Sequence, residues 1–247
     1  MEPREYQDSI IETAKKYNTL VVLPTGMGKT LIALFLAKHC LAENPKSKVL
    51  FLAPTRPLAQ QHFDYFNENL PELYAEMSLF TGQIDAEKRK KLWQVTDIIF
   101  STPQCIANDL KKNKISLENV SLLIEDECHR CLKNYDYTYV ARRFHEQSGG
   151  KILGLTASPG ADSKTIQEIC NTLKIEKVEV RNRESVDVKP YIQELETEII
   201  KVDFPEDFQK IRAPLKELYD KKIEELKNRQ LLFGPAMKSR LLELQAK

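Results

Sequence analysis

A glycine-containing segment near the start of the chain has the composition of a phosphate-binding loop. Leu-Pro-Thr-Gly-Met-Gly-Lys-Thr occupies Leu23–Thr30, between an apolar run and a stretch with helical spacing. Gly26 and Gly28 let backbone N–H groups approach phosphate oxygens, and a helix that begins near Lys29 adds its positive end. We expect Lys29 to reach the β- and γ-phosphates of a nucleotide and the Thr30 hydroxyl to coordinate Mg²⁺.

This segment departs at one position from the general pattern of glycine, four residues, and then Gly-Lys-Ser or Gly-Lys-Thr. Leu23 stands where the first glycine of that pattern would be. An ordinary strand-to-helix turn is therefore the alternative interpretation of this segment taken alone. The residues expected to hold the nucleotide here are Thr25, Gly26, Met27, Gly28, Lys29 and Thr30.

Further along the chain, an apolar run ends abruptly in two carboxylates and an imidazole. The segment Leu122–Arg130 reads Leu-Leu-Ile-Glu-Asp-Glu-Cys-His-Arg, which places Asp126 and Glu127 at the end of a buried strand. Asp126 is suited to hold Mg²⁺, directly or through water, and Glu127 to orient and deprotonate an attacking water. We expect His129 to couple this site to a neighbouring element. Acidic strand ends are often only solvated, but the phosphate-binding loop upstream favours the catalytic interpretation.

The segments around these two motifs predict an α/β fold. Several of the apolar runs are apolar on both faces, which is typical of covered parallel strands. The repeated strand–helix–strand order predicts a parallel sheet with helices on both faces. The predicted strands are Leu20–Leu23, Val49–Ala53, Ile98–Ser101, Val120–Glu125, Ile152–Leu155 and Lys177–Val180, and the predicted helices are Lys29–Leu41, Pro57–Asn69, Gln104–Lys112 and Ser163–Leu173.

The pattern changes in the last third of the chain. Residues 181–204 are interpreted as a connector, within which Glu194–Phe204 alternates imperfectly and predicts an extended strand. From Pro205 onward a helical segment is predicted, because Ile211, Leu215, Leu218 and Leu226 follow helical spacing. The amphipathic pattern still continues at the last residue, so we expect residues 205–247 to be a truncated part of a helical domain and residues 1–180 to be the nucleotide-binding domain.

The bulk composition excludes several classes of protein. The chain has 247 residues, of which 42% are hydrophobic, so a sizeable core is expected. An odd number of cysteines, five, argues against a secreted disulfide framework, and no apolar run approaches the roughly 18–20 residues of a membrane span. The first residues lack the pattern of a secretion signal. We therefore expect an intracellular protein, cytoplasmic or, in a eukaryote, nuclear, with no membrane partner.

Charge does not decide whether nucleic acid is a partner. Lys and Arg number 37 against 36 Asp and Glu, for a formal net charge of +1, so a nucleic-acid site must be local. The basic run Glu87–Lys91 is interpreted as a solvated helix face. The remaining histidines, His39, His62 and His145, lie far apart in the sequence and suggest no ligand set.

The ordered motifs resemble those of superfamily 2 helicases. Arg4 and Gln7 look like the adenine-recognition residues that precede the phosphate loop, and Pro24–Thr30 is similar to motif I. Asp126–His129 looks like motif II in its DECH form. Thr156 and Ser158 stand in a Thr-Ala-Ser segment that resembles motif III, which couples hydrolysis to domain movement. The resemblance implies a RecA-like domain that uses ATP with Mg²⁺.

Other segments resemble the motifs with which these helicases contact nucleic acid. Ala53–Gln61 looks like motif Ia, and Thr81–Gly82 and Thr102–Gln104 resemble the two later ones. Each follows a predicted strand, where hydroxyls, backbone N–H groups and helix N-termini can hold phosphates. The expected contacts are Thr55, Arg56, Gly82, Thr102 and Gln104.

Within the superfamily, the chain most resembles the Hef/FANCM branch. Val188–Glu196, followed by a charged helical segment, looks like the lead into the helical insertion of that branch. The resemblance implies an ATP-dependent helicase or translocase acting on branched or forked DNA, as in DNA repair. It also implies a partner, the second RecA-like domain with its arginine finger, which these residues do not contain.

Two alternatives remain open from the sequence. The DECH spelling also occurs in RIG-I-like and Dicer-like relatives, so a double-stranded-RNA-directed ATPase is the first alternative. The second is a binding module that holds ATP or nucleic acid without turnover. It is favoured for an isolated fragment because loss of an arginine finger can cost on the order of 10³–10⁵ in rate.

Overall fold

The computed structural model describes residues 2–70, 74–132, 135–158, 163–191, 200–202, 205–237 and 241. The chain forms two compact units, Met1–Gln193 and Glu194–Lys247. The first unit extends beyond the domain boundary expected at residue 180, because Val188 is buried in its core. Each unit is described by itself.

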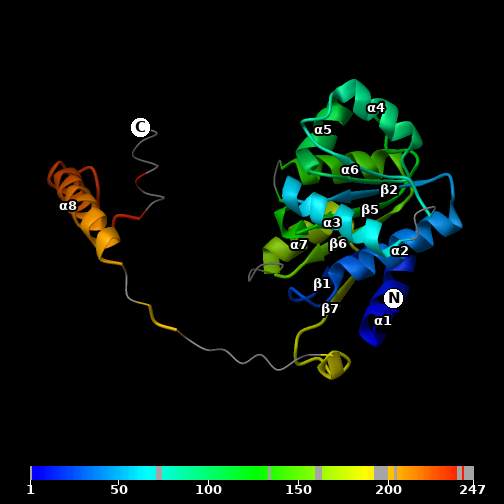
Figure 1. Ribbon diagram of the computed structural model, residues 1–247, viewed down its shortest axis with the longest axis horizontal. Coiled ribbons are helices and arrows are strands. Elements are labelled where there is room, and N and C mark those ends of the chain that lie inside the picture. Colours follow the sequence, from blue (N-terminus) through cyan, green and yellow to red (C-terminus); the bar gives the residue numbers. More distant parts are fainter. Residues whose placement is uncertain are drawn as a thin grey trace. The chain divides into compact units, whose positions relative to one another are not determined.

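The first unit is built on a parallel sheet (Figure 1). Its strands are β1 (Thr19–Val22), β2 (Lys48–Leu52), β3 (Met77–Phe80), β4 (Ile98–Ser101), β5 (Val120–Asp126), β6 (Lys151–Thr156) and β7 (Lys177–Val180). They are ordered β3-β4-β2-β5-β6-β1-β7, and every neighbouring pair runs parallel. The predicted parallel α/β fold is therefore confirmed.

Helices cover both faces of this sheet (Figure 1). They are α1 (Glu5–Lys16), α2 (Lys29–Glu43), α3 (Arg56–Asn69), α4 (Ala86–Val95), α5 (Pro103–Lys111), α6 (Asp136–Gln147) and α7 (Ser163–Leu173), with short 3₁₀ helices η1 (Cys128–Arg130) and η2 (Lys189–Tyr191). The first three pack on one face and α4 to α7 on the other. Strand side chains alternate between these layers, so that Val49 and Phe51 face α1 to α3 while Leu50 and Leu52 face α4 to α7.

Aromatic packing anchors α3 on the sheet. The ring of Phe66 in α3 meets Phe100 of β4 at 5.0 Å and Phe51 of β2 at 5.8 Å between ring centroids, both edge to face. Such pairs contribute about 0.5–1.5 kcal/mol each beyond the burial of their area. The start of α3 is therefore held at a defined position beside the ends of β2 and β4.

Several elements differ from the sequence-based expectation. The strands and helices predicted in the first unit are present, with ends that differ by at most two residues. Helices α1 and α6 and the edge strand β3 were given no predicted range, and α4 was anticipated only as the helix face Glu87–Lys91. Of the expected strand Glu194–Phe204, residues 200–202 are not in a strand, and the remainder lies outside the described residues.

The second unit contains α8 (Glu206–Asn228), which begins directly after Pro205 as predicted. Its apolar residues Ile211, Leu215 and Leu218 are exposed, and Pro214 lies inside the helix. The amphipathic pattern at the end of the chain falls mostly outside the described residues. No helix in the described part of the chain is long and apolar enough to cross a membrane.

The run Glu87–Lys91 is not uniformly solvated, because Arg89 is buried. Its guanidinium donates to both carboxylate oxygens of Asp109 in α5, each at 2.6 Å. It also donates to the carbonyl oxygens of Thr81, at 3.2 Å, and Ile84. This side chain therefore ties the loop after β3 to α5, and the sequence-based interpretation was wrong at this residue.

We predict that Asp109→Ala lowers the free energy of unfolding by about 3–5 kcal/mol, because it leaves the Arg89 charge buried without its partner. The control is Asp136→Ala, which breaks an exposed ion pair to Lys111 at 3.3 Å and should cost about 0–1 kcal/mol. Denaturant unfolding of both variants measures the difference. Equal losses of stability would contradict the prediction.

A second buried charge, Glu125, has no such partner. Its side chain is fully buried near the carboxyl end of β5, and no conventional hydrogen bond within the described residues reaches either carboxyl oxygen. Burial raises the pKa of Glu125 to about 8, and the Cys131 thiol, a weak donor, opposes that rise only in part. At neutral pH the carboxyl is therefore held mainly in its protonated form.

We predict that Glu125→Gln flattens the dependence of stability on pH. The unfolded chain releases this proton near pH 4.5 and the folded chain only near pH 8, so the folded state loses stability as pH rises between these values. Unfolding free energies measured across this window should fall for the wild type, relative to Glu125→Gln, by on the order of 1 kcal/mol per pH unit. The exposed Glu118→Gln is the control, and a Glu125→Gln slope equal to the wild-type slope would contradict the assignment.

Candidate functional site

Three adjacent strands deliver the nucleotide motifs to one edge of the sheet. The loop Leu23–Thr30 follows β1, Asp126 ends β5 and Thr156 ends β6, and β6 lies between the other two. In the register, Val22 is beside Thr156 and Asp126 is beside Leu155. The Leu23 N–H donates to the Thr156 carbonyl oxygen at 3.0 Å. The three segments that resemble motifs I, II and III are thus neighbours.

The loop needs glycine at two positions. Gly26 and Gly28 have φ angles of +84° and +77°, in the left-handed region that side chains disfavour. At Gly28, an added Cβ would also lie 2.2 Å from Nε2 of Gln7. Any side chain there would displace the Gln7 amide from its place beside the loop, so this position has both a conformational and a steric requirement.

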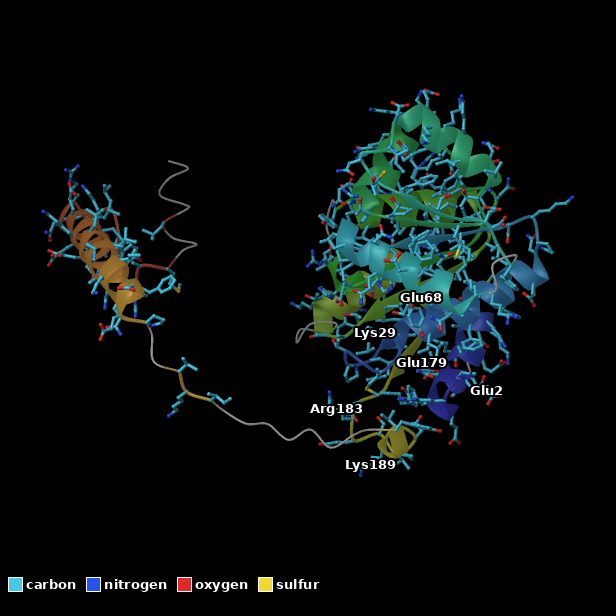
Figure 2. All side chains as sticks on the ribbon, viewed as in Figure 1. Glu2, Lys29, Glu68, Glu179, Arg183 and Lys189 are labelled. Atoms are coloured by element: carbon cyan, nitrogen blue, oxygen red, sulfur yellow. The ribbon has the colours of Figure 1, made fainter. Side chains whose placement is uncertain are left out.

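The lysine of the loop folds back onto its own backbone. Lys29 is half-buried, and its Nζ donates to the Leu23 carbonyl oxygen at 2.8 Å. Figure 2 labels this side chain. Burial lowers the pKa of Lys29, while the charges of Glu127 and Asp126 act in the opposite direction. The ammonium group therefore lies within the field of both carboxylates.

The start of α1 is fastened to the loop. Gln7 is buried, and its Nε2 donates to the Met27 carbonyl oxygen at 3.3 Å while its Oε1 accepts from the Arg4 backbone N–H at 2.9 Å. The Tyr6 hydroxyl donates to the same Met27 oxygen at 2.9 Å. The Arg4 guanidinium lies over the ring of Tyr191, 5.1 Å from its centroid. Gln7 is therefore bonded directly to the loop, and the backbone of Arg4 is bonded to Gln7.

The acidic turn has a strained backbone. Glu127 adopts φ 51° and ψ 43°, a left-handed conformation that is uncommon for residues other than glycine. Directly before it, Asp126 is buried, and the Tyr137 hydroxyl donates to its carbonyl oxygen at 2.8 Å. The two consecutive carboxylates contact different histidines, Asp126 contacting His62 and Glu127 contacting His129.

His129 lies between the acidic turn and the end of β6. Its Nδ1 is 3.2 Å from Oε2 of Glu127 and 3.0 Å from Oγ1 of Thr156. The same Thr156 hydroxyl oxygen accepts from the Ser158 N–H at 3.2 Å. These contacts join the DECH segment to the Thr-Ala-Ser segment, which is the kind of link expected for His129.

A further histidine, His62 of α3, was assigned no role from the sequence. It is buried, and its Nε2 lies 3.0 Å from Oδ2 of Asp126 while its Nδ1 lies 3.4 Å from Oγ1 of Thr30. Its only local signal is its position directly after Gln61, the last residue of the segment that resembles motif Ia. From the sequence, His62 was only one of three histidines that suggested no ligand set, and its contacts with Asp126 and Thr30 were not anticipated.

The expected nucleic-acid contacts lie along the other half of the same edge. Thr55 and Arg56 follow β2, Gly82 follows β3, and Thr102 and Gln104 follow β4, and these three strands are adjacent. The first three residues are exposed and the last two half-buried. The helices α3 and α5 begin here, and neither N-cap threonine bonds to its helix through its side chain. Because Pro57 and Pro103 have no N–H, the first-turn N–H groups that could meet an anion there include those of Arg56 and Gln104.

Comparison with known proteins gives a consistent result. The DEAD/DEAH box helicase family matches residues 4–166. A Methanocaldococcus jannaschii protein, provisionally named an ATP-dependent RNA helicase, is 37% identical over 100% of this chain and 32% of its own length. The Fanconi anemia group M protein homolog of Mus musculus is 35% identical over 93% of this chain and 11% of its own length.

A solved structure shares the fold. The crystal structure of the Pyrococcus furiosus Hef helicase domain superposes with a TM-score of 0.75 at 40% identity, covering 98% of this chain and 51% of that chain. The chain thus spans about a third or less of these curated relatives and about half of the solved one. The family match and the named relatives indicate that the chain uses ATP. It belongs to the DEAD/DEAH box helicase family, in which its relatives include the Hef and FANCM helicases.

Proposed function

We propose that this chain is the ATP-binding motor domain of an ATP-dependent helicase or translocase that acts on branched or forked DNA inside the cell. One observation carries the proposal: the order of strands in the sheet. The nucleotide motifs follow β5, β6 and β1, and the expected nucleic-acid contacts follow β3, β4 and β2, along the same edge. A conformational change caused by ATP at the nucleotide half of that edge is therefore transmitted directly to the nucleic-acid half.

The residues at the loop and the acidic turn suit Mg²⁺. The Thr30 hydroxyl and the Asp126 carboxylate both contact the imidazole of His62, one at each ring nitrogen. Their oxygens are of the type that Mg²⁺ prefers, and this ion needs few protein ligands because water and substrate phosphates complete its coordination. When bound with ATP, Mg²⁺ would neutralise charge on the phosphates.

The remaining roles follow from position. The backbone N–H groups of residues 25–30 hold phosphate oxygens, and Lys29 exchanges its bond to the Leu23 carbonyl for the β- and γ-phosphates. Glu127 orients the attacking water and takes its proton. His129 contacts both Glu127 and Thr156 and transmits a change at Glu127 to Thr156. Arg4 and Gln7 recognise the adenine.

Turnover needs a partner that these residues do not supply. We infer that a second RecA-like domain closes over the bound ATP, contributes an arginine finger and is coupled through Thr156 and Ser158. Residues 205–247, after a connector at 181–204, are proposed to begin the helical insertion of the Hef/FANCM branch. The length of the solved Hef chain, about twice the length matched here, supports the presence of a further domain.

The test of the substrate class is ATP hydrolysis by the full-length parent protein with no nucleic acid, single-stranded DNA, forked DNA or double-stranded RNA. Stimulation by forked DNA supports the proposal. Stimulation by double-stranded RNA alone favours the RNA-directed alternative, which the name of the Methanocaldococcus jannaschii relative motivates. Nucleotide binding without hydrolysis in any condition favours the binding-module alternative.

We predict that Lys29→Ala abolishes productive ATP binding, because the phosphates lose their only lysine partner in the loop. Glu127→Gln should retain ATP binding and lower hydrolysis by about 10²–10⁴-fold, because the general base is lost. Equilibrium binding of a fluorescent ATP analogue and steady-state hydrolysis by the parent protein separate the two effects. The controls are the exposed Lys38→Ala on the same helix and Glu118→Gln before β5. Rapid turnover by Glu127→Gln would remove Glu127 from the base role.

We predict that Arg56→Ala weakens binding to single-stranded and forked DNA to a similar extent whatever the base sequence. The plot of log affinity against log salt should become shallower by about one unit, since one phosphate contact is lost. Fluorescence anisotropy at several salt concentrations measures both effects. Arg142→Ala, an exposed arginine on α6, is the control. A salt slope that is identical in Arg56→Ala and wild type would exclude Arg56 as a phosphate contact.

A further inference from the structure

His62 contacts both of the side chains proposed to hold the metal. Its Nε2 lies 3.0 Å from Oδ2 of Asp126, and its Nδ1 lies 3.4 Å from Oγ1 of Thr30. The imidazole is buried, with 8% of its residue surface exposed, so water does not compete strongly for either nitrogen. It is thus a single rigid group that spans the phosphate loop after β1 and the acidic turn after β5.

The hydrogen-bonding capacity of each group favours one arrangement. Asp126 as a carboxylate only accepts, so the facing Nε2 must carry a proton. In a neutral imidazole Nδ1 is then an acceptor, and the Thr30 hydroxyl donates its one hydrogen to it. The lone pairs of the Thr30 oxygen are consequently turned away from His62 and remain available to a cation. A hydroxyl that ligates a cation requires this orientation.

The ring of His62 is itself fixed in place. It lies 4.4 Å from the ring of Phe51, with an angle of 33° between the planes, and Phe51 belongs to the aromatic group that anchors α3 on the sheet. The imidazole is therefore not free to move with Thr30 or Asp126. The side chains of these two proposed ligands instead take the orientation that the fixed imidazole sets. Groups that fix metal ligands in this way typically account for about 10- to 100-fold in metal affinity.

We propose that His62 is a positioning residue that sets the orientation of the Thr30 hydroxyl and the Asp126 carboxylate for Mg²⁺ binding with the nucleotide. The inference rests on the proposed function, because it assumes that Thr30 and Asp126 ligate the ion. It assigns to α3, which begins at the expected nucleic-acid contacts Thr55 and Arg56, a second role at the nucleotide site. The competing explanation is a core histidine whose contacts serve stability alone.

The test is a titration of Mg²⁺ against the binding of a fluorescent adenine nucleotide to the whole chain, with a parallel series in EDTA. His62→Phe keeps a flat ring against Phe51 and removes both nitrogens. It should leave nucleotide affinity in EDTA unchanged and raise the Mg²⁺ concentration for half-maximal enhancement by about tenfold or more. His39→Phe is the control, because His39 pairs with Glu43 on α2 and touches neither proposed ligand.

Two results would overturn the proposal. One is a wild-type Mg²⁺ requirement in His62→Phe, and the other is an equal loss of nucleotide affinity with and without Mg²⁺, which indicates a purely structural role. Thermal unfolding establishes whether His62→Phe is folded. If it is not, His62→Gln is judged by the same two criteria. If the nucleotide affinity of the wild-type protein is the same with and without Mg²⁺, the metal assignment in the proposed function is refuted, and this inference with it.

Discussion

The direction of the strands is the constraint on which the site depends. Because every neighbouring pair in the sheet is parallel, all the carboxyl ends open at one edge, and whatever follows them is gathered there. The order of strands then divides that edge into two halves. Segments far apart in the chain, such as the loop after β1 and the acidic turn after β5, become neighbours without any contact of their own being needed to bring them together. The covering helices, fixed by aromatic and aliphatic packing, hold these segments in position.

Local patterns in the sequence were sufficient for much of this arrangement. Apolar runs that end in Leu23 and Asp126 marked the central strands, since a covered strand must be apolar on both faces. The contacts between elements could not be obtained in the same way. His62 contacts Thr30, 32 residues before it, and Asp126, 64 residues after it. No pattern in the sequence around His62 predicts either contact. Arg89 was misjudged because its lysine neighbours are exposed, whereas its own burial is decided by Asp109 on another helix. Short edge elements such as β3, only partly buried, carry too weak an apolar pattern to be recognised.

Two buried ionisable side chains in this core differ in charge state: one keeps its charge and the other is held neutral. Arg89 keeps its charge because Asp109 and two carbonyl oxygens surround it. Glu125 has no comparable partner, and its burial instead favours the neutral acid. The neutral carboxyl of Glu125 stabilises the fold less than the buried ion pair of Arg89 does. Glu125 nevertheless stands directly before Asp126. The strand that presents the proposed metal ligand therefore carries a destabilising group that a plain hydrophobic residue would avoid, and we find no contact in the described residues that compensates for it.

The left-handed backbone of Glu127 has a consequence for how this protein can change. A side chain in that region lowers the free energy of unfolding by on the order of 1–3 kcal/mol. Replacement by glycine or asparagine would remove most of this loss. Selection for stability alone would therefore remove Glu127, and random substitution would often find the more stable replacement. That the chain retains a glutamate there means that stability has been given up at this position, and stabilising designs based on preferred backbone conformations should leave this residue untouched.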